Sequence, residues 1–160
     1  MKKVLVVGGG GRCHAIVDAL SRSPQVSQIF CAPGNALISK QATLVPISDT
    51  DIESLKAFAI KEGIDLTVVG PEASLAVGIV DSFREAGLKI FGHTRAATMI
   101  ESSKEFAKHL MEENGIPTAA YRSFTSYDEA MAYVDSRPYP AVIKYDGLAA
   151  GKGVVIASDR

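Results

Sequence analysis

Five short apolar runs, separated by segments with helical spacing and by glycine-bearing loops, constrain the fold of this chain most strongly. The runs span residues 4–7, 26–31, 43–47, 66–69 and 88–91. Runs of this length are typical of strands that are buried on both faces of a sheet. Helices are expected after residue 11, over residues 50–63 and over residues 75–87. This alternation predicts an α/β fold, an open parallel sheet with helices on both faces.

Glycine-bearing loops follow four of these predicted strands. They occupy residues 8–12, 32–35, 70–72 and 92–94. In an open parallel sheet, ligands bind outside the carboxyl ends of the strands, where such loops lie. The sequence therefore places its candidate binding site in these loops.

The pattern changes after about residue 100. A helix is expected to begin at Ser102 or Ser103 and to end at Gly115, and residues 119–124 can form a strand. Ser126 and Glu129 have the spacing of a capping box, as Thr50 and Glu53 have earlier in the chain. A further helix is therefore expected up to about residue 136.

The apolar runs 141–144 and 154–157 enclose one short glycine-rich loop. Two such runs around a short loop predict an antiparallel hairpin. We therefore divide the chain into a first domain, residues 1–100, and the incomplete start of a second domain, residues 101–160.

The first glycine loop joins a predicted strand to a predicted helix. Backbone amides at such a turn, with a helix N-terminus behind them, bind phosphate groups well. Arg12 adds a fork of hydrogen-bond donors. The alternative is a tight turn that needs glycine only for its dihedral angles. Four consecutive glycines, residues 8–11, exceed that need and favour a ligand site.

The loop does not match the dinucleotide-binding fingerprint. From Gly8, the sixth position of G-x-G-x-x-G is Cys13, and from Gly9 it is His14. The acid expected at the end of the second strand, which would bind a ribose, is also missing, because Cys31 is followed by Ala and Pro. A phosphate or sugar-phosphate ligand therefore fits better than NAD.

Two polar residues follow other predicted strands. Glu72 could accept hydrogen bonds from ribose hydroxyls or an amine, or it could be an acid that the helix dipole stabilises at a helix start. Asn35, taken alone, is typical of a turn residue in the left-handed conformation. Neither residue identifies a ligand by itself.

The second glycine-rich loop is not a P-loop. Only three residues separate Gly147 from Gly151, and Gly153 stands where a P-loop has Ser or Thr. A hairpin flap that closes over nucleotide phosphates fits instead, because Lys144 and Lys152 bring two cations to the loop. The alternative is a flexible surface hairpin with an incidental lysine.

The composition limits the classes of partner. The net charge of −1 attracts neither nucleic acid nor an acidic membrane, and no stretch approaches the ~20 apolar residues of a membrane helix. The cysteines lack the spacing of a zinc site. Reduced thiols are the simplest interpretation, with a Cys13–Cys31 disulfide as the alternative. We therefore expect a cytoplasmic protein.

Several short segments occur together in one order along the chain. They are residues 6–12 (VVGGGGR), 32–35 (APGN), 68–73 (VVGPEA), 91–92 (FG), 101–104 (ESSK), 106–108 (FAK), 115–118 (GIPT) and 146–154 (DGLAAGKGV). Together they resemble the glycinamide ribonucleotide synthetase family. This family belongs to the ATP-grasp ligases, in which a Rossmann-like parallel-sheet domain precedes two lobes that hold ATP. The resemblance covers the whole chain.

The resemblance implies a function. The family joins glycine to 5-phosphoribosylamine in purine synthesis, through glycyl phosphate, with ATP and Mg²⁺ or Mn²⁺ as cofactors and with no nucleic acid or membrane as a partner. The residues implied at the phosphoribosylamine site are Gly9, Gly10, Gly11, Arg12, Asn35, Pro71 and Glu72. The residues implied at the ATP site are Lys104, Lys144, Gly147, Gly151, Lys152 and Gly153.

The chain departs from the family in two ways. Cys13 stands where the family usually has Glu, between the Arg and the His of the first loop. Members of the family are also far longer, and their metal ligands lie downstream. We therefore expect an N-terminal fragment that is inactive alone and holds no complete catalytic or metal site. The alternative is a non-catalytic sugar-phosphate-binding protein of the same fold.

Overall fold

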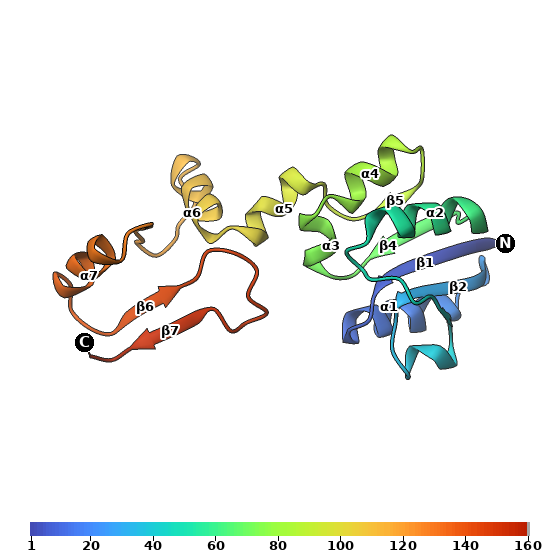
Figure 1. Ribbon diagram of the computed structural model, residues 1–160, viewed down its shortest axis with the longest axis horizontal. Helices are drawn as coiled ribbons and strands as arrows, with labels where there is room; N and C mark the ends of the chain where they lie inside the picture. Colours follow the sequence, from blue (N-terminus) through green and yellow to red (C-terminus); the bar gives the residue numbers. More distant parts are fainter. Residues whose placement is uncertain (160) are drawn as a thin grey trace. The chain divides into compact units, whose positions relative to one another are not determined.

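The computed structural model describes residues 1–159 (Figure 1). The chain forms two compact units, one from Met1 to Thr98 and one from Met99 onward. Each unit has its own sheet. Helix α5 (Arg95–Ser102) spans the boundary between them.

The first unit is built on a five-stranded sheet whose order is β3-β2-β1-β4-β5. All neighbouring strands in it are parallel, which confirms the predicted α/β class. The strands are β1 (Lys2–Gly8), β2 (Val26–Pro33), β3 (Thr43–Leu44), β4 (Leu66–Val69) and β5 (Ile90–Phe91). The helices are α1 (Gly11–Ser21), the short 3₁₀ helix η1 (Ile38–Lys40), α2 (Ile52–Glu62), α3 (Glu72–Ala76) and α4 (Ile79–Glu85).

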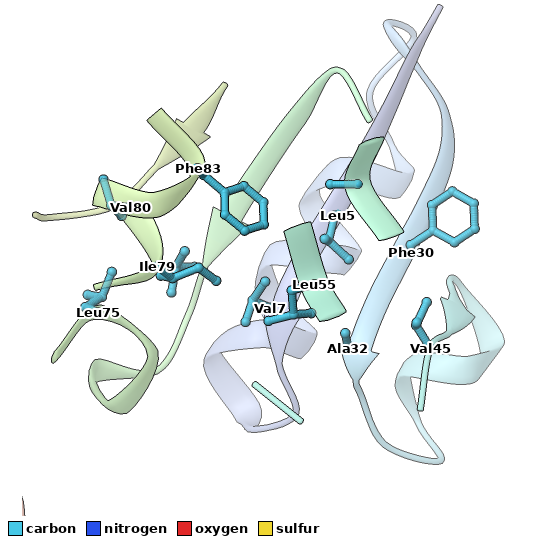
Figure 2. Close-up of a cluster of buried hydrophobic side chains, with 12 residues drawn as sticks. Leu5, Val7, Phe30, Ala32, Val45, Leu55, Leu75, Ile79, Val80 and Phe83 are labelled. Carbon is cyan, nitrogen blue, oxygen red and sulfur yellow. The ribbon is translucent and has the colours of Figure 1, made fainter. Parts of the chain in front are cut away.

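Both faces of this sheet are covered, because successive side chains of a strand point to opposite faces. On β1, Leu5 and Val7 join the core under α2, α3 and α4, and Val6 joins the core under α1 and η1. Figure 1 shows α1 on one side of the sheet and α2 and α4 on the other. Figure 2 shows Phe83 and Leu55 reaching from α4 and α2 toward the strands.

Four local predictions in the first unit were wrong, and the fifth strand is one of them, because it begins at Ile90 rather than at residue 88. The N-cap of α2 is Asp51, whose carboxylate accepts the Ser54 N–H at 3.1 Å, so Thr50 does not form the expected capping box. The helix expected over residues 75–87 is two helices, which separate at Gly78 in the left-handed region (φ +91°). The third strand ends at Leu44 rather than at residue 47, and α5 was not predicted.

The second unit contains α6 (Lys104–Glu113), α7 (Tyr127–Asp135), β6 (Ala141–Lys144) and β7 (Val154–Ala157). The two strands pair antiparallel, which confirms the predicted hairpin. Ser103 is the N-cap of α6, as expected, and its hydroxyl accepts the Phe106 N–H at 3.1 Å. The side chain of Ser126 makes no such bond, so the capping box expected before α7 does not form.

The strand expected over residues 119–124 is absent from the structure. This segment is fastened to α6 instead of to a sheet. Lys108 Nζ donates to the Thr118 hydroxyl and to the Ala119 carbonyl, both at 2.7 Å. The Tyr121 hydroxyl donates to Glu112 at 3.2 Å. The backbone therefore follows side chains of a helix, which the local apolar pattern does not reveal.

The two units differ in burial. None of the residues 99–159 is buried, whereas β1 alone has Val4, Leu5, Val6 and Val7 buried. The hairpin exposes Ile143, Val155 and Ile156 by half or more of their surfaces. Over the described part of the chain, we find no helix with the length and apolar character that a membrane span requires.

Candidate functional site

The candidate site lies where the strand order of the first sheet reverses. The chain proceeds from β1 to β2 and β3 on one side, and β4 and β5 lie on the other side of β1. The crevice outside the carboxyl ends of the strands at such a switch point is the usual ligand site of open parallel sheets. Here the loops after β1 and β4 meet, because the Gly70 N–H donates to the Val7 carbonyl at 3.0 Å.

Gly8 and Gly9 are required by the fold itself. Gly8 has φ +120°, and a Cβ there would lie 2.5 Å from Cys13 Sγ and 2.7 Å from Pro71 Cδ. A Cβ on Gly9 would lie 2.6 Å from the Gly34 carbonyl oxygen. For these two residues, the tight-turn interpretation is sufficient.

Gly10 and Gly11 are different. A Cβ on either residue would meet nothing within 4 Å. Gly10 has φ −84°, which any residue can adopt, and it is the N-cap of α1 without a side chain to cap the helix. The first turn of α1 also carries no acidic residue. These two glycines therefore keep open space in front of N–H groups that lack intrahelical partners, as a phosphate site requires.

Arg12 and Glu72, predicted from separate loops, are in contact. Arg12 Nη2 and Glu72 Oε2 are 2.6 Å apart, and the two side chains are 66% and 30% exposed. Glu72 lies in the first turn of α3, directly after the N-cap Pro71. The carboxylate engages one edge of a guanidinium that carries five N–H donors. The pair thus holds a cation beside the N-terminus of α1.

Asn35 fastens the loop after β2 to the glycine loop. Its Nδ2 donates to the Gly9 carbonyl at 2.8 Å, and its Oδ1 accepts the N–H of Leu37 and of Ile38 at 2.8 and 3.0 Å. The left-handed residue of this turn is Gly34 (φ +72°), so that interpretation of Asn35 was wrong. Asn35 shapes the site through its hydrogen bonds to the backbone.

Cys13 is packed beneath the glycine loop, away from the open space. Its Sγ lies 3.6 Å from the Val7 carbonyl oxygen, and it fills the volume that a Cβ on Gly70 would need, at 2.4 Å. Burial raises the pKa of the Cys13 thiol, and burial together with the neighbouring Cys13 raises the pKa of Cys31 to about 12. Both thiols are free, in agreement with the reduced interpretation.

The second glycine-rich loop joins β6 to β7. Gly147, Ala150 and Gly151 have φ angles of +135°, +46° and +76°. The Lys152 N–H donates to the Ala149 carbonyl at 2.8 Å and closes a turn around Ala150 and Gly151. Below it, the Tyr145 N–H donates to the Gly153 carbonyl at 2.8 Å, which continues the ladder by one bond.

Two of the predicted nucleotide-site residues meet at the base of this loop. Lys104 Nζ donates to the Gly147 carbonyl at 2.8 Å. Lys144 lies at the end of β6 opposite Val154, and Lys152 lies in the turn. Among residues 1–159, the structure gives the ammonium groups of Lys144 and Lys152 no hydrogen bond or ion pair. Sequence reasoning missed Asp146, which precedes Gly147 and accepts three hydrogen bonds from the start of α6.

The described residues 1–159 contain no group of three or more His, Cys, Asp or Glu side chains that could hold a metal ion.

Fold and loop geometry together define a parallel α/β unit with glycine-bearing loops at its switch point, followed by a unit with a glycine-rich hairpin. The sequence matches the family described as phosphoribosylglycinamide synthetase, N domain, over residues 2–101, and that family's ATP-grasp (A) domain over residues 102–160. The chain belongs to the phosphoribosylglycinamide synthetase family.

Curated relatives agree with this assignment. The chain is 57% identical over 157 residues to a phosphoribosylamine–glycine ligase of Ralstonia nicotianae, with 97% of this chain and 37% of the relative covered. It is 55% identical to the enzyme of the same name from Caldanaerobacter subterraneus, with 98% and 38% covered. The chain thus spans little more than a third of the length of these relatives.

Solved structures show the same likeness. The phosphoribosylamine–glycine ligase of Thermotoga maritima matches with a TM-score of 0.74 and 29% identity, over 98% of this chain and 36% of that one. A biotin carboxylase of Campylobacter jejuni matches with a TM-score of 0.78 and 18% identity, over 99% and 38%. At that identity the second likeness concerns the fold alone.

Proposed function

We propose that this chain is the part of a phosphoribosylamine–glycine ligase that binds 5-phosphoribosylamine and begins the ATP site. The whole enzyme would join glycine to 5-phosphoribosylamine with ATP. The carrying observation is the open N-terminus of α1 at the switch point, with Arg12 beside it. The names of the curated relatives support the reaction.

In this proposal the ligand's phosphate is bound by backbone N–H groups around Gly10, Gly11 and Arg12. The helix dipole and the guanidinium both favour an anion there. Glu72 orients Arg12 and lies where it could accept hydrogen bonds from an amine or from ribose hydroxyls. Gly9, Asn35 and Pro71 hold the three loops at the spacing that this ligand needs.

ATP would be held by the second unit, through Lys104, Lys144, Lys152 and the glycines Gly147, Gly151 and Gly153. Backbone N–H groups of a glycine-rich loop and lysine ammonium groups are suited to phosphates. Mg²⁺ or Mn²⁺ would neutralise phosphate charge, with ligands that we do not assign to this chain. We place the domain boundary near residue 100, and the two free thiols agree with a cytoplasmic location.

A chimaeric ligase tests the proposal. This chain would replace the matching 157-residue segment of the Ralstonia nicotianae relative, and glycine-dependent ADP release would be measured with 5-phosphoribosylamine and Mg-ATP. We expect activity comparable to that of the relative. A folded chimaera without activity would contradict the proposal.

Gly10→Ala and Gly11→Ala within the chimaera test the site itself. Because a Cβ meets nothing at either position, both variants should fold normally. Each should raise KM for 5-phosphoribosylamine, because a methyl group would occupy the space kept for its phosphate. An unchanged KM would place the phosphate elsewhere.

A further inference from the structure

Asp146 closes the N-terminus of α6 from 42 residues further along the chain. Its Oδ1 accepts the backbone N–H of Lys104 and that of Glu105, the latter at 3.1 Å. Its Oδ2 accepts the Ser103 hydroxyl at 3.0 Å. The loop residue directly before Gly147 is therefore bonded to the first turn of a distant helix.

The orphan N–H groups of α6 are all accounted for. Besides the two that Asp146 accepts, the Phe106 N–H is bonded to the Ser103 hydroxyl at 3.1 Å, and the N–H of the N-cap Ser103 is bonded to the Met99 carbonyl at 3.0 Å. A helix N-terminus with its donors satisfied in this way is not available to a phosphate. Its positive end holds a carboxylate of the chain itself, which is a favourable arrangement.

Lys104 of α6 adds a further hydrogen bond between the helix and the loop, through its side chain. Its backbone N–H is bonded to Asp146, and its ammonium group returns to the Gly147 carbonyl at 2.8 Å. One residue of α6 thus holds two successive residues of the loop. Beyond Gly147, the Lys152 N–H is bonded to the Ala149 carbonyl, and the Gly153 carbonyl at the far end of the loop accepts the Tyr145 N–H.

We propose that Asp146 is the positioning residue of the glycine-rich loop: it fixes one end of the loop to α6 and sets Lys104 against Gly147, so that the loop hinges at Gly147. The inference rests on the proposed nucleotide function of the loop. Gly147 suits a hinge because its φ of +135° lies in a region that other residues rarely adopt. Asp146 does not itself contact nucleotide in this inference.

Amide hydrogen exchange of the present chain tests the anchor without any nucleotide. Asp146→Asn keeps the shape of the side chain but loses the charge, and we expect exchange at Lys104 and Glu105 to become about tenfold faster, the scale of a charge-assisted hydrogen bond. The matched control is Asp128→Asn, an exposed aspartate in the first turn of α7. Unchanged exchange at Lys104 and Glu105 would overturn the inference.

Lys104→Met is a second variant that tests the same inference if Asp146→Asn does not fold. It retains the backbone N–H that Asp146 accepts and removes the bond to Gly147. We expect faster exchange across residues 147–152 and unchanged exchange in the first turn of α6. Equal effects on both segments, or none on the loop, would contradict the hinge at Gly147.

The chimaeric ligase supplies a readout that a purely structural role would not give. Asp146→Asn should raise KM for ATP about tenfold and leave KM for glycine within about twofold. Asp146→Glu, which keeps the charge, should recover part of the loss. If an active chimaera and its Asp146→Asn variant have equal KM values for ATP, the inference about Asp146 is overturned and the proposed function is unaffected. An inactive wild-type chimaera would contradict the proposed function, while the exchange data would still decide the anchor.

Discussion

The two glycine-rich loops are supported in opposite ways. The loop after β1 stands on a sheet with cores on both faces, and its first glycines are fixed by close packing against Cys13, Pro71 and Gly34. The loop after β6 stands on a hairpin in which no side chain is buried. It is held at its base by hydrogen bonds from α6. Packing and the Asn35 hydrogen bond fix the first loop, whereas hydrogen bonds at its base hold the second.

The helix N-termini beside these two loops also differ, namely in how their N–H groups are capped. That of α1 has no side-chain cap and no acid in its first turn. That of α6 is bonded to Ser103 and Asp146. Two glycine-rich loops thus accompany one helix end without a side-chain cap and one that the chain itself caps. The following predictions test this contrast.

The largest effect is expected in the core of the first unit. Phe83 is fully buried, so Phe83→Ala should lower the free energy of unfolding by about 3–5 kcal/mol. Val155→Ala on the hairpin, where 59% of the side chain is exposed, should change it by less than about 0.5 kcal/mol. Denaturant unfolding followed by circular dichroism measures the effect of Phe83→Ala on the first unit. All five tyrosines lie between residues 121 and 145, so tyrosine fluorescence follows the second unit. Similar losses in both variants would contradict the difference between the units.

Within the first loop, Gly8→Ala and Gly10→Ala should differ in their effect on the free energy of unfolding. Gly8→Ala forces a side chain into the left-handed region and against Cys13, which should cost about 2–4 kcal/mol of stability. Gly10→Ala should stay within about 0.5 kcal/mol of the wild type. Thermal denaturation of the two variants gives the comparison. A large loss in Gly10→Ala would mean that packing also requires this glycine.

Arg12→Ala should weaken binding of glycinamide ribonucleotide by about 1.5–3 kcal/mol, because a charge-assisted hydrogen bond is lost. Arg22→Ala is the matched control, since Arg22 follows the other end of α1 and is paired with Asp18 at 3.1 Å. Isothermal titration calorimetry measures both, and NAD should not bind in the same assay. If both variants bind glycinamide ribonucleotide equally weakly, Arg12 does not contact this ligand.

Ser74→Ala should stabilise the first unit by about 1 kcal/mol. Ser74 is fully buried. Among the buried side-chain nitrogen and oxygen atoms of residues 1–159, its hydroxyl oxygen is the one without a hydrogen-bond partner. Removing a buried polar group that has no partner removes its desolvation cost. Chemical denaturation measures the change. A loss of stability would show that the hydroxyl makes a useful interaction.

The smallest effect concerns pH. Loss of solvent raises the pKa of Asp146, but the hydrogen bonds from Glu105, Ser103 and Lys104 and the Lys104 charge outweigh it, so the pKa lies below the ordinary value. A lowered pKa in the folded state means that the carboxylate stabilises the second unit above about pH 4 and loses this effect as the pH falls through its folded value. The difference in melting temperature between wild type and Asp146→Asn, followed by tyrosine fluorescence, should therefore shrink below pH 4. A constant difference would contradict this assignment.

Local signals predicted much of the fold. The strands β4, β6 and β7 begin and end where the apolar runs do. Local signals failed where a distant group decided the outcome. The segment 119–124 has an apolar pattern, but Lys108 draws its backbone onto α6. The helix expected over residues 75–87 failed for a local reason instead: it divides at Gly78, where a left-handed backbone separates two helices.

The sequence by itself determined the class of fold, the loops that carry the candidate sites and the resemblance to the family, because apolar periodicity and glycine positions are local properties of the chain. Only the tertiary structure decided which glycines are needed for packing and which keep space open, and that Arg12 meets Glu72. It also decided that Asp146 holds α6. The Arg12–Glu72 and Asp146–Glu105 contacts join residues 60 and 41 positions apart, and no local pattern encodes which distant partner a hydrogen-bonding group will find.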